Sequence, residues 1–222
     1  MATAAFFDLD GTLLTVNSAK LWIKRELRLG HIPLWQFLRA GLWLGGYRLG
    51  MLDMESALRA ALTQLRGLEE EDIRAQTHAW WREEVRPFIA PGAHAVLEAH
   101  RRAGDRLVLL TSSSRYASEM AREEFGLDHT LFQGYEVKDG RFTGEPVRPL
   151  CYGPGKVAIA ESWAREAGVD LKESAFYSDS STDVPMLERV GKPFAVLPDP
   201  RLKMIARKRG WPVLDWRRIS SP

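Results

Sequence analysis

Residues 4–13 of this 222-residue chain read AAFFDLDGTL, and the stretch holds both a structural and a chemical signal. A short apolar run closed by a glycine-containing turn predicts a buried strand over residues 4–9. Asp8 and Asp10 are two residues apart, so in an extended chain their side chains point to the same face. Two carboxylates in one small volume repel each other, and a hard cation such as Mg²⁺ would relieve that repulsion. An acidic turn that merely closes the strand is the structural alternative.

The region after Pro91-Gly92 alternates between helix-like and strand-like patterns. Helices are expected over 93–103, 115–125, 157–167, 183–190 and 202–207, and strands over 107–110, 175–177 and 194–197. Asp139-Gly140 joins two short polar-apolar runs in a tight hairpin. This alternation predicts an α/β fold whose parallel sheet is covered by helices on both faces. In such sheets ligands bind beyond the carboxyl ends of the strands.

A helical segment separates the first motif from this alternating region. Apolar residues recur at helical spacing over 54–65 and 73–85, and residues 34–49 are strongly apolar. Pro87 and Pro91-Gly92 interrupt the pattern. We therefore expect a helical cap at residues 15–88, inserted into a core made of residues 1–14 and 89–222.

A hydroxyl-rich segment follows the strand expected at 107–110. Thr111 stands at the carboxyl end of that strand, and Ser112 and Ser113 follow it close to a helix start. A hydroxyl backed by N–H groups at a helix start is suited to hold a phosphate oxygen. Capping of the next helix is the structural alternative.

Lys156 and two aspartates complete the set of candidate polar residues. Lys156 ends the stretch GPGK, which is not a nucleotide P-loop, because Leu150 occupies the position of the first required glycine and Val157 replaces the Ser or Thr. A solvated lysine at a helix start is the alternative. Asp179 follows an expected strand and Asp183 opens the next helix, where a turn aspartate and an N-cap are the alternatives.

The order and strand-end placement of these motifs resemble those of the haloacid dehalogenase superfamily of phosphohydrolases. The residues that carry the resemblance are Asp8/Asp10, Thr111, Lys156 and Asp179/Asp183. The helical insert directly after the first motif and the closing run at 177–187 look most like the phosphoserine-phosphatase-like branch. The resemblance implies a Rossmann-like core with a helical cap, and hydrolysis of a small organic phosphate ester with Mg²⁺ as cofactor.

The resemblance also implies a role for each carboxylate. Asp8 would attack phosphorus and form an aspartyl-phosphate, while Asp10 would protonate the leaving oxygen and then activate water. Mg²⁺ would be held by the Asp8 carboxylate, the Asp10 backbone carbonyl and Asp179. Asp183 would orient this metal site. A dehalogenase reaction is disfavoured, because that chemistry needs neither a metal nor the second aspartate.

Four other residues are expected to meet the substrate. Thr111 and Lys156 would steady the transferring oxygens and neutralise their charge, and Ser112 is the alternative hydroxyl. Phosphoserine phosphatases that resemble this chain carry a Glu nine residues after the nucleophile, which meets the substrate's amino group. Here that position is Asn17, which is neutral. We therefore expect that phosphoserine is not the preferred substrate.

The cap is unusually rich in tryptophan, which favours a less polar leaving group. A lipid-like or an aromatic phosphate is the first candidate, although most of these rings are expected to pack in the cap interior. Basic residues flank the apolar segment 34–49, which would suit contact with an anionic membrane; they are Lys24, Arg25, Arg28, Arg39 and Arg48. Phosphoserine phosphatase, phosphotransferase and membrane-associated lipid-phosphate phosphatase are the alternative functions.

The amino-acid composition excludes several other kinds of function and site. Lys and Arg total 31 against 29 Asp and Glu, a formal net charge of +2, which gives no support for nucleic-acid binding. The single cysteine, Cys151, excludes an intrachain disulfide and a cysteine-based metal site. The N-terminus lacks the basic start of a signal peptide, and no run reaches the ~18 apolar residues of a membrane span. These features predict a cytoplasmic location, and they give no indication of the oligomeric state.

Overall fold

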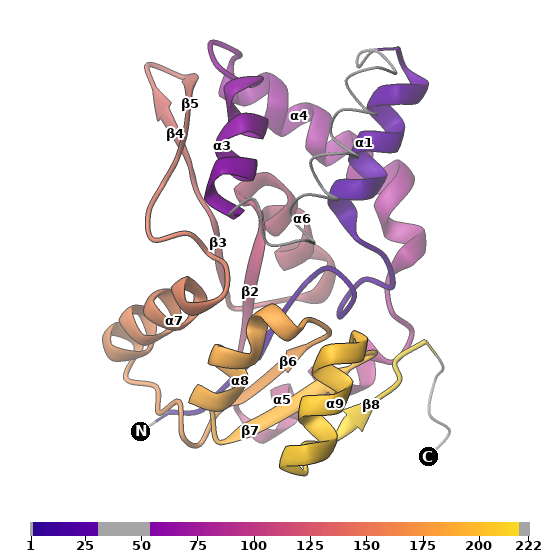
Figure 1. The fold of residues 1–222 in the computed structure, drawn as a ribbon, viewed down its shortest axis with the longest axis vertical. Helices are drawn as coiled ribbons and strands as arrows, with labels where there is room; N and C mark the ends of the chain where they lie inside the picture. Colours follow the sequence, from indigo (N-terminus) through magenta and orange to yellow (C-terminus); the bar gives the residue numbers. More distant parts are fainter. Residues whose placement is uncertain (1, 31–53, 218–222) are drawn as a thin grey trace.

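The computed structural model describes residues 2–30 and 54–217, and Figure 1 shows their arrangement. Six strands form one parallel sheet in the order β3-β2-β1-β6-β7-β8. Their bounds are β1 (Ala4–Phe7), β2 (Arg106–Ser114), β3 (His129–Gln133), β6 (Ala175–Ser178), β7 (Lys192–Val196) and β8 (Val213–Leu214). The apolar stretch at 34–49, with Trp35, Trp43, Arg39 and Arg48, lies outside the described residues.

Helices cover both faces of this sheet, which confirms the α/β prediction. One face packs against α5 (Ala93–Ala103) and α6 (Arg115–Phe125), whose bounds match the predicted ones. The other face packs against α7 (Pro154–Ala167), α8 (Val184–Arg189) and α9 (Pro200–Arg209). Successive strand residues point to opposite faces, so Phe6 belongs to one core cluster and Phe7 to the other. Burying each ring contributes roughly 2–3 kcal/mol.

Strand β2 is longer than predicted, and this changes the setting of Thr111. The strand was expected to end at Leu110, but it continues to Ser114, whose side chain caps α6 by accepting from the N–H of Ala117. Pairing with β3, which the sequence pattern did not predict, continues as far as Ser114 after a shift in register. Thr111 therefore lies inside the strand, and Ser112 and Ser113 do not start the helix.

The segment 15–88, which the sequence predicts as a cap and for which we keep that name, contains α1 (Ser18–Arg28), α3 (Met54–Thr63) and α4 (Glu70–Trp80) among the described residues. A π-helical turn (Trp81–Val85) and a 3₁₀ turn (Arg86–Phe88) lead from α4 back to the core. Figure 1 shows these helices gathered above the sheet, with the hairpin of β4 (Tyr135–Lys138) and β5 (Arg141–Pro146) rising beside α3. The predicted hairpin is confirmed.

The β4–β5 hairpin belongs to the core in sequence, yet it bonds to the cap. The N–H of Gly67 donates to the carbonyl of Phe142 at 2.8 Å, and the N–H of Phe142 donates to the carbonyl of Leu68 at 3.0 Å. Arg141 also pairs with Glu69. The cap is thus joined to the core at this hairpin as well as at its two chain connections.

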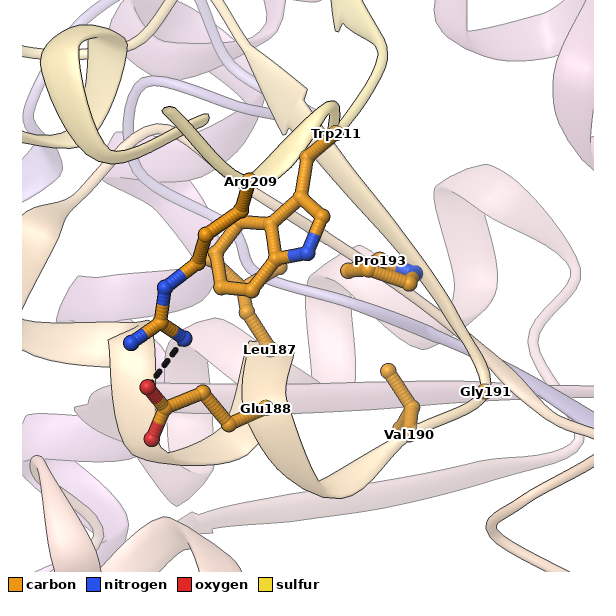
Figure 2. A pocket seen from close by; sticks show the side chains of 7 residues that line it. All are labelled: Leu187, Glu188, Val190, Gly191, Pro193, Arg209 and Trp211. Atoms are coloured by element: carbon orange, nitrogen blue, oxygen red, sulfur yellow. Dashed lines mark ion pairs between the residues drawn. The ribbon is translucent and has the colours of Figure 1, made fainter. Parts of the chain in front are cut away.

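A pocket of about 470 Å³ lies at the amino end of β7, away from the motif residues (Figure 2). The Arg209 guanidinium lies 5.0 Å from the Trp211 ring centroid and pairs with Glu188. Among the described residues, no helix is long and apolar enough to cross a membrane.

Candidate active site

The first motif and Asp179 meet at the carboxyl ends of two neighbouring strands. Strands β1 and β6 pair in parallel, and the N–H of Asp8 donates to the carbonyl of Tyr177 at 2.9 Å. Gly11 has φ +76°, and a Cβ at this position would lie 2.2 Å from Oδ2 of Asp179. Only glycine fits there, because a side chain would both strain the backbone and strike the carboxylate. This close approach brings the DLDG turn against Asp179.

Lys156 is a buried cation between two carboxylates. Its Nζ donates to Oδ1 of Asp8 at 2.9 Å and to Oδ2 of Asp183 at 2.7 Å. The Ser178 hydroxyl donates to the same Oδ2 of Asp183 at 2.7 Å. Lys156 reaches this position because Gly155 lets the start of α7 approach the chain at Leu150, whose carbonyl oxygen would lie 1.9 Å from an added Cβ. The solvated-lysine alternative is therefore wrong.

The site carries a surplus of negative charge. Burial, with the nearby Asp183, raises the pKa of Asp8 to about 7, and burial with Asp8 and Asp183 raises the pKa of Asp179 to about 8. Burial also raises the pKa of Asp10. Lys156 is held charged: burial disfavours its ammonium, but Asp183 and Asp8 outweigh that effect and raise its pKa. One lysine does not neutralise four aspartates.

Asp10 joins the sheet edge that carries Asp8 and Asp179 to the first turn of α1. The N–H of Ser18 donates to Oδ1 of Asp10 at 2.9 Å, and Nδ2 of Asn17 lies 3.4 Å from Oδ2 of Asp10. Oδ1 of Asn17 caps α1 by accepting from the N–H of Lys20 at 3.1 Å. The Ser18 hydroxyl lies 3.5 Å from the Ser113 hydroxyl. Asp10 is thus fixed by the first turn of the cap.

A family model described as haloacid dehalogenase-like hydrolase matches residues 5–188. The chain belongs to this family. It is 28% identical over 222 residues to histidinol-phosphatase of Neisseria meningitidis serogroup C (strain 8013), covering 98% of this chain and 100% of that protein. It is 32% identical over 223 residues to phosphoserine phosphatase SerB1 of Mycobacterium tuberculosis, covering 98% of this chain and 72% of that protein. This haloacid dehalogenase-like hydrolase is a phosphatase.

Solved structures of similar proteins agree with the family. A protein of unknown function from Bordetella pertussis Tohama I has a TM-score of 0.89 and 33% identity, over 97% of this chain and 99% of that one. A phosphoserine phosphatase described as a phospho-aspartyl intermediate analogue has a TM-score of 0.69 and 20% identity, over 98% of this chain and 95% of that one. The latter likeness supports the fold alone.

The donor set of this hydrolase fits a magnesium ion. No group of three or more His, Cys, Asp or Glu side chains in the described ranges forms a complete metal cage. Mg²⁺ needs no such cage, because it is typically held by one or two carboxylates while keeping several waters. Asp8 and Asp179 supply hard oxygen donors from two strand ends, and burial together with the neighbouring carboxylates raises the pKa of both groups.

The two candidate hydroxyls of this hydrolase have different partners. Thr111 is fully buried, and its Oγ1 accepts from the N–H of Ser113 at 3.1 Å. The Ser112 hydroxyl donates to the carbonyl of Cys151 at 2.7 Å. That bond directs Ser112 toward the loop before α7, whereas Thr111 bonds within its own strand.

Sequence reasoning missed two residues that support this hydrolase site. Ser178 holds Asp183, as described above. Asp199 accepts from the N–H of Ser181 at 2.7 Å through its carboxylate, and its own N–H donates to the carbonyl of Asp179 at 2.8 Å. The sequence does carry a signal for Asp199, because an Asp before Pro200 marks a helix start. No sequence pattern indicates that Asp199 contacts the loop that carries Asp179.

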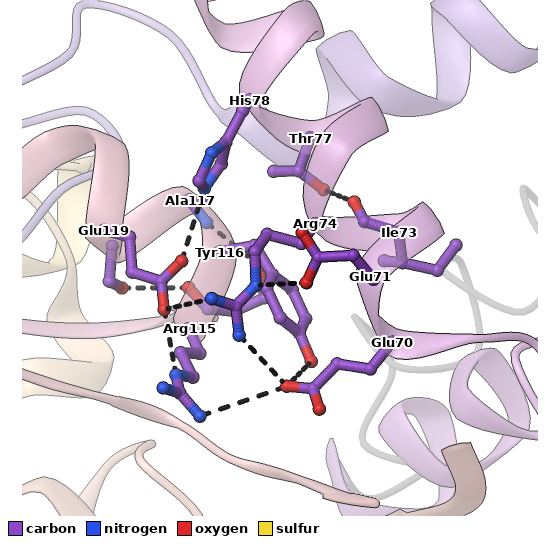
Figure 3. Close-up of polar contacts among 12 residues, drawn as sticks. Glu70, Glu71, Ile73, Arg74, Thr77, His78, Arg115, Tyr116, Ala117 and Glu119 are labelled. Atoms are coloured by element: carbon purple, nitrogen blue, oxygen red, sulfur yellow. Dashed lines mark hydrogen bonds and ion pairs between the residues drawn. The ribbon is translucent and has the colours of Figure 1, made fainter. Parts of the chain in front are cut away.

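Cap and core also meet at an interface between α4 and α6, shown in Figure 3. The Tyr116 hydroxyl donates to Glu70 at 3.1 Å, and His78 lies 3.3 Å from Glu119. Arg74 lies over the Tyr116 ring at 5.7 Å and 3.9 Å from Glu119. We call this set the α4–α6 interface; its members are Glu70, Arg74, His78, Arg115, Tyr116 and Glu119. Since α6 follows β2 directly, the interface connects the cap to the strand that carries Thr111.

Proposed function

We propose that this phosphatase is a Mg²⁺-dependent phosphomonoester hydrolase that works through an aspartyl-phosphate on Asp8. The observation that carries the proposal is the buried carboxylate of Asp8, which is 7% exposed and held by Lys156 at a strand end. Lys156 binds one of its two oxygens and so fixes the rotation of the carboxylate. The other oxygen is then oriented for attack on phosphorus.

Asp10 is suited to proton transfer. Burial raises its pKa, which favours the protonated form that a general acid needs before the leaving oxygen departs. After departure the same carboxylate can take a proton from the attacking water. The Ser18 N–H, at 2.9 Å from Oδ1, keeps the group in place through both steps.

Magnesium would be held by the carboxylates of Asp8 and Asp179 and the backbone carbonyl of Asp10, and Asp183 would support this shell through Lys156 and Ser178. When bound, the ion supplies positive charge to the phosphoryl oxygens. Thr111 and the Lys156 ammonium complete the positive and hydrogen-bonding surroundings of the phosphoryl group.

For the substrate we propose a phosphate ester of an alcohol that carries an aromatic or heteroaromatic ring, with histidinol phosphate tested first. Both histidinol phosphate and phosphoserine carry an ammonium, and Asn17, which is neutral and already bound to α1 and Asp10, offers a charge to neither. One observation supports histidinol phosphate over phosphoserine. The Neisseria histidinol-phosphatase is covered over its full length, whereas the mycobacterial phosphoserine phosphatase extends beyond the match.

The test is a panel of phosphate esters assayed with Mg²⁺ and with excess chelator. The panel contains histidinol phosphate, phosphoserine, p-nitrophenyl phosphate and a lysophospholipid phosphate. We expect hydrolysis only with Mg²⁺, inhibition by beryllofluoride, and the highest kcat/KM for histidinol phosphate. Full activity in chelator would overturn the mechanism, and a clear lead for phosphoserine would overturn the substrate. Added acceptor alcohols separate hydrolysis from phosphoryl transfer.

The Asp10→Asn variant tests the acid role separately. Its rate should fall by ~10²–10⁴ for an alkyl phosphate, and by less for p-nitrophenyl phosphate, whose leaving group hardly needs a proton. Equal losses in the first chemical step for both esters would contradict that role.

A further inference from the structure

A partly buried chain of polar side chains lies beneath the strand ends that carry Asp8 and Asp179, and it takes no part in the mechanism above. His100, near the end of α5, places Nδ1 2.7 Å from Oδ2 of Asp105 and Nε2 2.8 Å from the hydroxyl of Tyr177. The Thr3 hydroxyl donates to the other oxygen of Asp105. The chain therefore runs from Thr3 through Asp105 and His100 to Tyr177.

The hydrogen-bond directions follow from Asp105. Burial alone would raise the pKa of Asp105, but hydrogen bonds from Thr3 and His100 outweigh it and hold that pKa below its usual value. A carboxylate only accepts, so the His100 proton lies on Nδ1. When the ring is neutral, Nε2 is an acceptor and the Tyr177 hydroxyl donates to it.

Tyr177 is the middle ring of an aromatic ladder across three strands. Phe7, Tyr177 and Phe194 are register partners on β1, β6 and β7. The Tyr177 ring stacks on Phe7 with centroids 5.0 Å apart and on Phe194 at 4.5 Å, both at 6°. The His100 ring also meets Phe7 edge-on at 6.1 Å. Phe7 directly precedes Asp8 in the chain, and Tyr177 directly precedes Ser178.

The backbone of Tyr177 links this ring packing to the candidate active site. The carbonyl of Tyr177 accepts the N–H of Asp8 at 2.9 Å. The residue after Tyr177 is Ser178, which holds Asp183. A shift of the Tyr177 ring would therefore move the nucleophile and the Lys156–Asp183 pair together. Displacements of about 1 Å at a reacting centre can cost on the order of 10²-fold in rate.

We propose that His100 is a positioning residue of this phosphatase, which fixes the nucleophile Asp8 by holding the Tyr177 hydroxyl. The inference rests on the proposed function, in which Asp8 is the nucleophile. His100 touches neither the substrate nor the reacting atoms, and its contribution is made entirely through Tyr177.

Four variants test this role on the full chain. His100→Asn keeps an amide donor for Asp105 but is too short to reach Tyr177, whereas His100→Gln can accept from the Tyr177 hydroxyl. Tyr177→Phe keeps the ring stack and removes the hydroxyl. Ser174→Ala is the matched control, because it removes hydrogen bonds to Asp170 at 2.6 Å and from Ala4 at 3.0 Å near the opposite ends of β6 and β1.

We expect His100→Asn and Tyr177→Phe to lower kcat roughly tenfold while KM stays within about twofold, since substrate binding is untouched. His100→Gln should restore most of kcat, and Ser174→Ala should lower stability without changing kcat. If His100→Asn and Tyr177→Phe lose only stability, as Ser174→Ala does, the positioning role is wrong.

Amide hydrogen exchange at Asp8 gives a readout that needs no substrate. Protection of the Asp8 N–H should fall in His100→Asn and Tyr177→Phe, and should stay at the wild-type level in His100→Gln and Ser174→Ala. Unchanged protection in all four variants would overturn the inference. A wild-type protein that hydrolyses no ester, but shows this exchange pattern, would overturn the proposed function and leave the positioning contact established.

Discussion

Two regions are built from ion pairs but differ in burial. One is the candidate catalytic edge, by which we mean Asp8, Lys156 and Asp183, and the other is the α4–α6 interface. The side chains of Lys156, Asp8 and Asp183 are 3%, 10% and 2% exposed. At the α4–α6 interface the exposed fractions are 24% for Glu70, 29% for Arg74 and 51% for Arg115. Water and salt screen the second set and barely reach the first.

This difference in burial suits the two sets of ion pairs to different roles. Buried charges hold a fixed geometry and carry perturbed pKa values, which suits chemistry but costs stability when a partner is lost. The partly exposed pairs of the α4–α6 interface each contribute little, because water can replace either partner. The same residue types therefore have different consequences in the two regions.

The strongest test of the comparison is Asp8→Asn. Turnover should fall by more than about 10³-fold, because an amide is a poor nucleophile. Stability should change less than in Lys156→Met, since Lys156 keeps Asp183 as a partner and the neutral amide avoids the burial cost that raises the pKa of Asp8 to about 7. Steady-state kinetics and urea unfolding measure the two effects. Wild-type-like hydrolysis by a pure sample would contradict the site.

Lys156→Met should destabilise the protein by about 3–5 kcal/mol, the usual result of removing one partner of a buried pair. It leaves Asp8 and Asp183 facing each other without the ammonium. The double variant Lys156→Met, Asp8→Asn is the control and should recover part of the loss. A loss under about 1 kcal/mol in urea unfolding would mean that these charges are better solvated than their burial implies.

The stability of the metal-free protein should fall as pH rises from about 4 toward 8. The pKa of Asp8 is raised to about 7 and that of Asp179 to about 8, both from 3.8, so in this window the folded state binds more protons than the unfolded state. Mg²⁺ binds the ionised carboxylates and should reverse the loss. The rise in Tm on adding Mg²⁺ should be about 3 °C larger at pH 8 than at pH 5.5, corresponding to about 1 kcal/mol. An equal rise at both pH values would contradict this.

The smallest effect is expected at the α4–α6 interface. Glu119→Gln should change stability by less than about 0.5 kcal/mol, and the difference should vanish in high salt. The carboxylate accepts from Arg115 at 2.9 Å, but Arg115 is half exposed. Thermal unfolding at two salt concentrations measures it. A loss as large as that of Lys156→Met would remove the distinction between the two regions.

The sequence by itself predicted which carboxylates meet at this edge of the sheet. Asp8 and Asp179 were predicted because each follows a short apolar run, which is a local pattern, whereas Lys156 was predicted from the resemblance to the haloacid dehalogenase superfamily. In a parallel sheet the carboxyl ends of neighbouring strands share one edge, so local patterns were enough to bring distant residues together. Asp183, which opens a helical turn, followed from the same reasoning.

Only the tertiary structure decided the contacts that tune this edge. His100 and Tyr177 are 77 positions apart, and neither lies in a pattern that marks a hydrogen bond. The β4–β5 hairpin was predicted as a hairpin, but its bonds to the cap depend on how two separate segments fold. Such contacts are set by three-dimensional packing of side chains, which hydrophobic periodicity does not encode. The partners of Thr111 and Ser112 were decided in the same way, by the length of β2 and its pairing with β3.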